Sequence, residues 1–119
     1  MREAFAHEAV AVLSPGGDER ALGAAVTVAL CGHWEHPPPC PLAPHHCHTD
    51  RDADEVRLRV LFAAEPRDEP EVRRRIDNAL ASGAQTGPDG AVTRWRLRGS
   101  GPAAITPGET EHAGRLIAT

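Results

Sequence analysis

The chain has 119 residues, which suits one domain and leaves little room for a second, so we expect a single domain over 1–119. Its formal net charge of −4 gives no overall attraction for nucleic acid or for an anionic membrane. Residues 1–17 lack the apolar core of a signal peptide, and no run approaches the ~20 apolar residues of a membrane span. The sequence therefore favours a cytoplasmic protein with no nucleic-acid or membrane partner.

Short apolar or alternating segments predict a small antiparallel sheet. Alternation of polar and apolar side chains is typical of strands with one buried face. The predicted strands are residues 8–13, 24–34, 55–64 and 91–98. In the second of them, Cys31 and His33 fall together on the polar face. The turn-rich residues 14–17 separate the first two strands.

Two sequence signatures of helix starts predict the cover of this sheet. Asp68 and Glu71 have the spacing of a capping box, and the helix that they begin should end at Gly83. Thr106 and Glu109 repeat the spacing before a short C-terminal helix. The predicted fold class is α+β: an antiparallel sheet of about four strands with one or two helices packed on one face.

Cysteine and histidine residues are concentrated in one segment. The chain has ten of them, and eight lie within residues 31–48. Thiolate and imidazole suit borderline and soft cations, and mixtures of the two usually bind zinc. Five prolines lie between these ligands and reduce the entropy lost when the segment orders around an ion. The segment therefore predicts a transition-metal site on a loop over 31–48, with Zn²⁺ as the first choice.

The identity of the ligands stays open at this point. The most economical set is His36, Cys40 and His45, with Cys31, His33 and His46 competing for a fourth position. A closed structural site would use four protein ligands and favours Cys31, whereas a catalytic site could leave one position to water. The residues His46, Cys47 and His48 are adjacent in sequence, and such neighbours rarely all reach one ion, so some of them should point elsewhere. The spacing matches no standard zinc finger.

Arginines on the predicted strands suggest an anion site beside the metal. If the strands 55–64 and 91–98 are neighbours, Arg59 and Arg96 share one face and could grip a carboxylate or phosphate. The alternative is a solvated face, or one covered by a second subunit. Glu35 is a weak candidate for a general base beside a metal-bound water. His7 and His112 are isolated in the sequence and are expected at the surface.

The leading hypothesis is a small cytoplasmic protein in which zinc orders the 31–48 loop and presents a surface for a ligand or partner. One alternative is a metal-dependent enzyme with an open coordination position, acting on a small anionic substrate. A second alternative is a carrier or sensor of copper or nickel, which would use the surplus histidines and cysteines. The expected partners are the metal ion, a small anionic ligand and, in a homodimer, a second copy of the chain.

Overall fold

The computed structural model describes residues 1–31 and 43–119, apart from the side chain of Cys31. Within these ranges the elements are β1 (Glu3–Leu13), α1 (Ala21–Cys31), β2 (His45–Asp52), β3 (Glu55–Ala64), α2 (Glu69–Ala81), β4 (Ala84–Thr86), β5 (Val92–Ala103) and α3 (Thr110–Ala118). Short 3₁₀ turns at Pro66–Asp68 and Pro107–Glu109 lead into α2 and α3. None of the described helices is long and apolar enough to cross a membrane.

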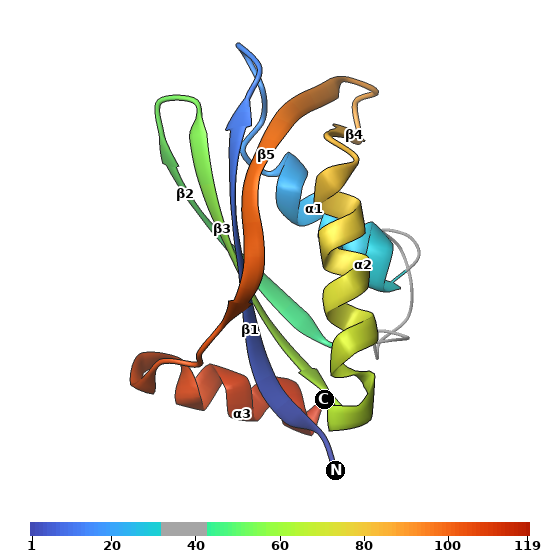
Figure 1. The fold of residues 1–119 in the computed structure, drawn as a ribbon, viewed down its shortest axis with the longest axis vertical. Helices are drawn as coiled ribbons and strands as arrows, with labels where there is room; N and C mark the ends of the chain where they lie inside the picture. Colours follow the sequence, from blue (N-terminus) through green and yellow to red (C-terminus); the bar gives the residue numbers. More distant parts are fainter. Residues whose placement is uncertain (32–42) are drawn as a thin grey trace.

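The strands form one curled antiparallel sheet in the order β2-β3-β1-β5-β4, which confirms the α+β fold class (Figure 1). If the short β4 is set aside, the chain order and the sheet order are those of a split β-α-β fold. In this topology β1 is central, with β3 and β5 on its two sides. The strands 55–64 and 91–98 are therefore not neighbours.

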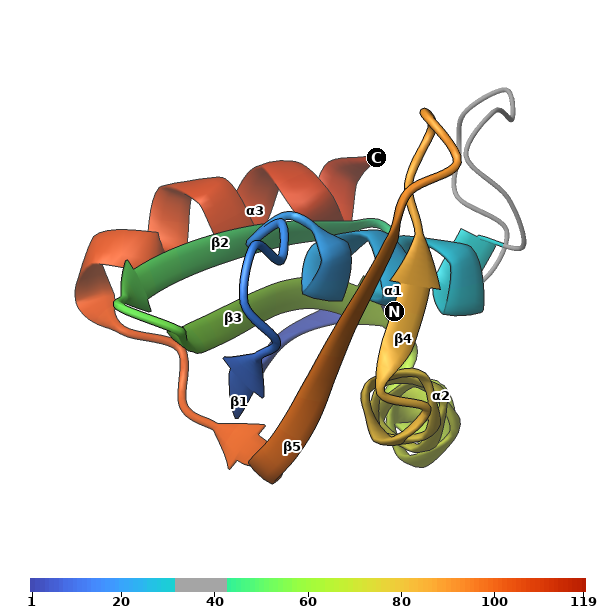
Figure 2. The same ribbon diagram turned by 90° about the horizontal axis from the view of Figure 1, so that it is seen from above.

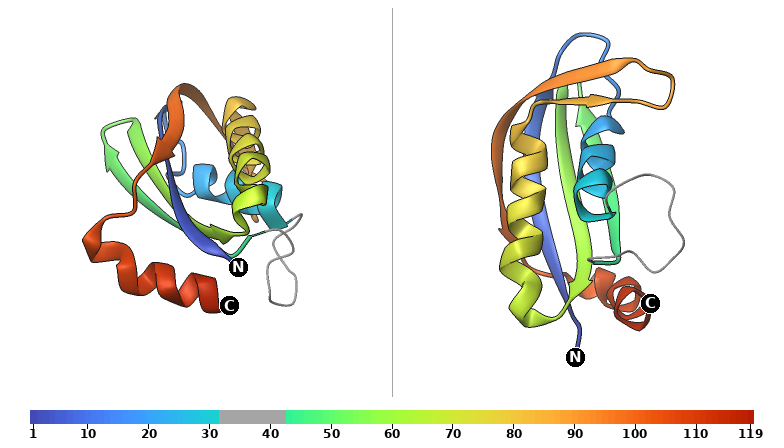
Figure 3. Two further views of the ribbon diagram at one scale, coloured as in Figure 1. Left: turned by 60° about the horizontal axis from the view of Figure 1, so that its bottom comes forward. Right: turned by 90° about the vertical axis from the view of Figure 1, so that its right-hand side faces the viewer.

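The two faces of the sheet are covered differently. Alternate residues of β1 and β3 point into the core beneath α1 and α2, among them Ala9, Ala11, Leu58, Val60 and Phe62. The third helix, α3, lies against β3 and β1 on the opposite side of the sheet (Figures 2 and 3). Of the two predicted helices, α2 thus lies on the core face and α3 partly covers the second face, while α1 adds a further helix beside α2.

The prediction of a strand over 24–34 is wrong, because residues up to Cys31 form α1. Val26, Val28 and Leu30 satisfy a period of two, but Leu22, Val26 and Leu30 also repeat every four residues and are all buried. Alanine has the highest helix propensity, and it occupies several of the remaining positions. The prediction that Cys31 and His33 share a strand face fails with that strand, and His33 lies outside the described residues.

The helix predicted to begin at Asp68 is confirmed as α2, but its predicted capping box does not form. Asp68 is the N-cap and makes no side-chain hydrogen bond to the helix backbone. Glu71 instead accepts hydrogen bonds from Arg74 and Arg75 one turn further on. In the second predicted box, Thr106 does donate its backbone N–H to Glu109 Oε1 at 2.9 Å.

The end of α2 is fixed by glycine and tryptophan. Gly83 follows the helix with φ of +73°, a conformation that disfavours side chains, as its predicted role requires. The backbone N–H of Trp95 donates to the Gly83 carbonyl at 2.9 Å, and the indole N–H donates to the Leu80 carbonyl at 2.8 Å. Trp95 is buried, so β5 and the last turn of α2 are joined inside the core.

Candidate metal site on β2 beside α1

The Cys/His segment spans two regular elements. Cys31 is the last residue of α1, and residues 45–48, expected in a loop, begin the edge strand β2. A hydrogen-bond contact of 3.0 Å between Thr27 Oγ1 and His45 Nε2 joins the two elements. The remaining candidates of the segment, His33, Glu35, His36 and Cys40, lie outside the described residues.

The ring of His45 is oriented toward α1 by a hydrogen bond to the backbone of Ala43. Its Nδ1 lies 3.1 Å from the Ala43 carbonyl oxygen, which can only accept, so Nδ1 carries a proton. In the neutral ring, Nε2 then holds the lone pair and accepts the Thr27 hydroxyl proton. An imidazole whose Nδ1–H is held by a backbone carbonyl is the usual arrangement of a histidine that ligates a metal through Nε2.

His46 points to the opposite face of the sheet, because successive side chains of a strand alternate. Its ring packs against His112 of α3 with 4.5 Å between the ring centroids and 56° between the planes. Partial burial lowers the pKa of His46, and the nearby His112 and His48 lower it further. His112, expected at the surface, is half-buried and in contact with the His46 ring. His45 and His46 cannot share one ion while β2 stays extended.

Cys47 lies on the same face as His45 and packs against α1. A methyl group at Gly23 would meet Cys47 Cβ at 3.3 Å, so this glycine permits the close approach of helix and strand. Burial raises the pKa of the Cys47 thiol to about 12, which keeps it protonated at neutral pH. His48 is on the other face, where its Nε2 lies 3.4 Å from Asp50.

A cleft of about 820 Å³ opens beside His45. Its walls come from the start of α1, from β2 and from the β4–β5 hairpin, and include Asp18, Arg20, Thr27, His45, Cys47 and Thr93. The Arg20 guanidinium is paired with Asp18 at 2.8 Å. The cleft therefore combines small apolar side chains with hydroxyl, imidazole and paired charged groups.

Within residues 1–31 and 43–119, no three His, Cys, Asp or Glu side chains are grouped so that they could hold a metal ion. The predicted ligands that the structure describes are thus individual side chains: His45 is directed toward α1, and His46 toward α3.

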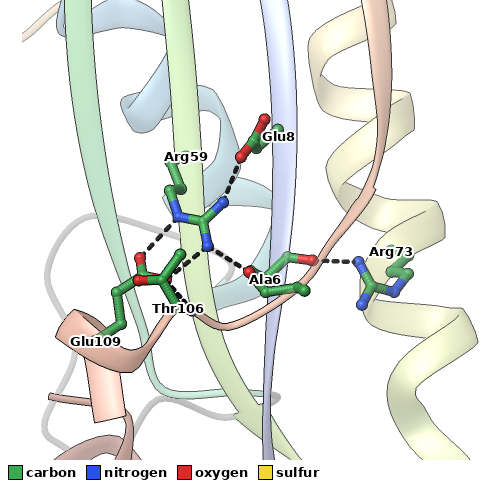
Figure 4. Close-up of polar contacts among 7 residues, drawn as sticks. Ala6, Glu8, Arg59, Arg73, Thr106 and Glu109 are labelled. Carbon is green, nitrogen blue, oxygen red and sulfur yellow. Dashed lines mark hydrogen bonds and ion pairs between the residues drawn. The ribbon is translucent and has the colours of Figure 1, made fainter. Parts of the chain in front are cut away.

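Arg59, predicted to bind an anion, is surrounded by protein acceptors (Figure 4). It donates to both carboxylate oxygens of Glu109 at 2.6 and 2.7 Å, to the Ala104 carbonyl at 2.6 Å, and to Glu8. This guanidinium holds the pKa of Glu109 at about 2. An external anion would have to displace one of these carboxylates. In this structure Arg59 instead joins the start of α3 to the sheet.

Arg96 is exposed on β5, where its register partner on β1 is Val12. The register partner of Arg59 on β1 is Glu8, which is four residues before Val12. At about 3.3 Å per residue, the two positions are roughly 13 Å apart along β1. The structure thus brings Arg59 and Arg96 to one face but not to one site.

His7, expected at the surface, is 1% exposed and lies between β1 and α2. Arg73 donates to Nδ1 at 2.9 Å, so Nε2 carries the ring proton, and it lies 2.8 Å from Asp77 Oδ1. Ser100 donates to the same Asp77 oxygen at 2.6 Å. Because Asp77 and Ser100 both meet Nε2, the group lacks the two-sided geometry of a catalytic triad. It joins α2 to β1 and β5.

No protein-family model matches the chain, and no curated protein matches its sequence. Among solved structures, it is similar to a crystal structure of an aminobenzoyl-glutamate utilization protein from Klebsiella pneumoniae, with a TM-score of 0.36 and 12% identity. The match covers 93% of this chain and 32% of that one, so the chain spans about a third of that protein's length. Its function therefore has to be inferred from the site itself.

Proposed function

We propose that this chain is a small metal-binding protein that holds one Zn²⁺ through its Cys/His segment at 31–48, with His45 as the ligand from β2. The observation that carries the proposal is the orientation of His45. Its Nδ1–H donates to the Ala43 carbonyl, and its Nε2 faces Thr27 of α1. The Cys/His segment begins at Cys31, the last residue of that helix. Binding through Nε2 would exchange the Thr27 hydroxyl for the ion and leave the backbone in place.

The remaining ligands of the proposed site come from the segment itself. His36 and Cys40 stay the first choices, and Cys31 or His33 the fourth. The direction of the His46 ring argues for His45 over His46 as the β2 ligand, because His46 lies on the α3 side of the strand. Cys47 is a poor choice, because burial disfavours the thiolate that a metal requires.

The cleft beside His45 favours one second candidate, a metal-dependent enzyme. A cleft of about 820 Å³ is large enough for a small substrate next to an ion at His45. In that case three protein ligands would leave a position for water. Arg20 lines this cleft, so it is better placed than Arg59 or Arg96 to meet a small anionic substrate.

Elemental analysis of untagged protein, purified without added metal, tests the proposal. We expect about one zinc per chain in the wild type. His45→Gln and Cys40→Ala should both lose it, because each removes a proposed ligand. Absence of stoichiometric metal from the wild type, even after zinc is offered, would contradict the proposal. Copper or nickel in place of zinc would favour the carrier or sensor.

Thr27→Val is the matched control for His45→Gln. It removes the same hydrogen bond between α1 and β2 but keeps the imidazole. If His45 is a ligand, Thr27→Val should retain zinc at the wild-type level. Equal loss of zinc in both variants would contradict the assignment of His45 as a ligand, because loss of the contact between α1 and β2 would then explain the result. Chelation then separates the two site types: removal of a structural zinc should lower the melting temperature more than removal of an open-site zinc.

A further inference from the structure

Two imidazoles from distant parts of the chain meet on the α3 side of the sheet. His46 belongs to the edge strand β2 and His112 to the first turn of α3, with 65 residues between them in the sequence. Their ring centroids are 4.5 Å apart. Neither ring makes a hydrogen bond within residues 1–31 and 43–119, so their nitrogens remain available to another partner. The pair is separated from His45 by the alternation of β2.

The position of His112 is fixed by contacts that do not involve either imidazole. Glu109, three residues earlier, is held by the two-pronged hydrogen bond from Arg59 of β3. Ala113, the next residue, is buried against the sheet. The start of α3 is therefore anchored on both sides of His112. A site assembled from such supported side chains loses little entropy when it takes up an ion.

The spacing of the rings suits a shared ion. Zn–N bonds of about 2.0–2.1 Å at a tetrahedral angle place two imidazole centroids roughly 5 Å apart. The observed 4.5 Å is within about half an ångström of that value. Rotation of the rings about χ2, which is a broad torsion for histidine, would aim one nitrogen of each at a common point.

We propose that His46 and His112 form a second metal site, in which a borderline divalent cation such as Zn²⁺ bridges β2 and α3. Water completes the coordination, since within residues 1–31 and 43–119 no third His, Cys, Asp or Glu is grouped with this pair. Because the site has two protein ligands, the ion should bind more weakly than at a site with three or four protein ligands. This second site does not depend on the proposed function.

Zinc titration of the metal-free, full-length protein tests the bridge, with calorimetry to count the equivalents. The wild type should bind two equivalents, one tight and one weaker. His112→Gln and His46→Gln should each lose the weaker equivalent and keep the tight one. The use of both variants separates ligation from folding, because His46→Gln leaves α3 unaltered. His48→Gln is the control for a nearby surface histidine, whose ring is turned toward Asp50, and it should keep both.

The imidazole C–H resonances give a direct readout of the same titration. During addition of the weaker equivalent, the signals of His46 and His112 should shift together, while the buried His7 should not respond. If His112→Gln binds zinc as the wild type does, the bridge is overturned and the ring pair is only a packing contact. The bridge would also be overturned if His112→Gln kept the weaker zinc equivalent and His48→Gln lost it, because the ion would then be bound by β2 alone. A wild type with only the weaker equivalent would contradict the proposed function and leave the bridge standing.

Discussion

The helices α2 and α3 lie on opposite sides of the sheet and are held there by different forces. The side chains of Val72, Ile76 and Leu80 on α2 are fully buried. On α3 only Ala113 is buried. Each helix is also joined to the sheet by an arginine: Arg73 of α2 donates to the Ala6 carbonyl of β1, and Arg59 of β3 donates to Glu109 (Figure 4).

Because of this difference, we expect the two helices to respond differently to a change of pH. Apolar burial depends little on pH, so the apolar core beneath α2 forms the fixed frame, and the polar contact of His7 with Asp77 holds α2 in addition. The docking of α3 depends on the carboxylate of Glu109, whose charge changes with pH. We therefore expect substitutions beneath α2 to lower the stability of the whole chain, and changes around α3 to act in a condition-dependent way.

The largest expected effect is at Ile76. Ile76→Ala should lower the free energy of unfolding by about 2–5 kcal/mol, because it removes a fully buried side chain and leaves a cavity. Urea denaturation, followed by far-ultraviolet circular dichroism, measures this change. A loss below about 1 kcal/mol would mean that α2 is not the main cover of the core.

A smaller loss is expected at the polar group beneath α2. Asp77→Ala removes the acceptor of the Ser100 hydroxyl and the partner of the buried His7 Nε2. Leaving such groups without their partner costs about 1–3 kcal/mol. The same denaturation experiment tests this value. An unchanged unfolding free energy would show that the group is replaceable and that apolar packing alone fixes α2.

Glu109 should give a pH-dependent contribution. Its pKa in the folded chain is about 2, below the ordinary 4.5, because Arg59 donates to its carboxylate. Its stabilisation is therefore fully present above about pH 4.5 and is lost as the pH falls toward 2. Glu109→Gln should lower stability by about 1–2 kcal/mol at pH 7, and the difference from the wild type should shrink in acid.

The matched control for Glu109 is Glu111, an exposed carboxylate in the first turn of α3 that contacts Arg115 at 3.2 Å. Glu111→Gln should change stability by no more than about 0.5 kcal/mol at either pH. A difference between Glu109→Gln and the wild type that stays constant from pH 7 to pH 3 would contradict the assigned role of the Arg59–Glu109 contact.

The smallest effect is expected at Arg96, which makes no ion pair or hydrogen bond within the described part of the chain. Arg96→Ala should change stability by no more than about 0.5 kcal/mol, as is usual for exposed side chains. Arg59→Ala should cost more, because it leaves Glu8 and Glu109 without their shared cation. Similar stabilities for the two variants would remove the contrast between them.

Much of the frame could be predicted from residue patterns. Residues 55–64 alternate clearly, and Gly83 marks the end of α2. The helix α1 was missed because its residues are apolar nearly all round, so that no period stands out. The strand β2 was missed because it is an edge strand of polar residues, and its sequence HHCHTDRD resembles a solvated loop. Its place in the sheet comes from pairing with β3.

The candidate site was only partly predictable, for a related reason. The density of cysteine and histidine in 31–48 is a local property, visible in the sequence. The contact of His46 with His112 joins positions far apart in the chain and depends on where α3 docks. The burial of His7 depends likewise on α2 and on β5. A signal for His7 was present, since it falls on the core-facing parity of β1 with Ala9 and Ala11.

The main proposal is that the Cys/His segment holds a zinc ion with His45 as one ligand. X-ray absorption at the zinc edge of the purified protein is the most direct test of it. We predict a four-coordinate first shell that contains nitrogen at about 2.0 Å and at least one sulfur at about 2.3 Å, with imidazole scattering reduced in His45→Gln. A six-coordinate shell of oxygen atoms alone, or a spectrum identical in the wild type and in His45→Gln, would contradict it.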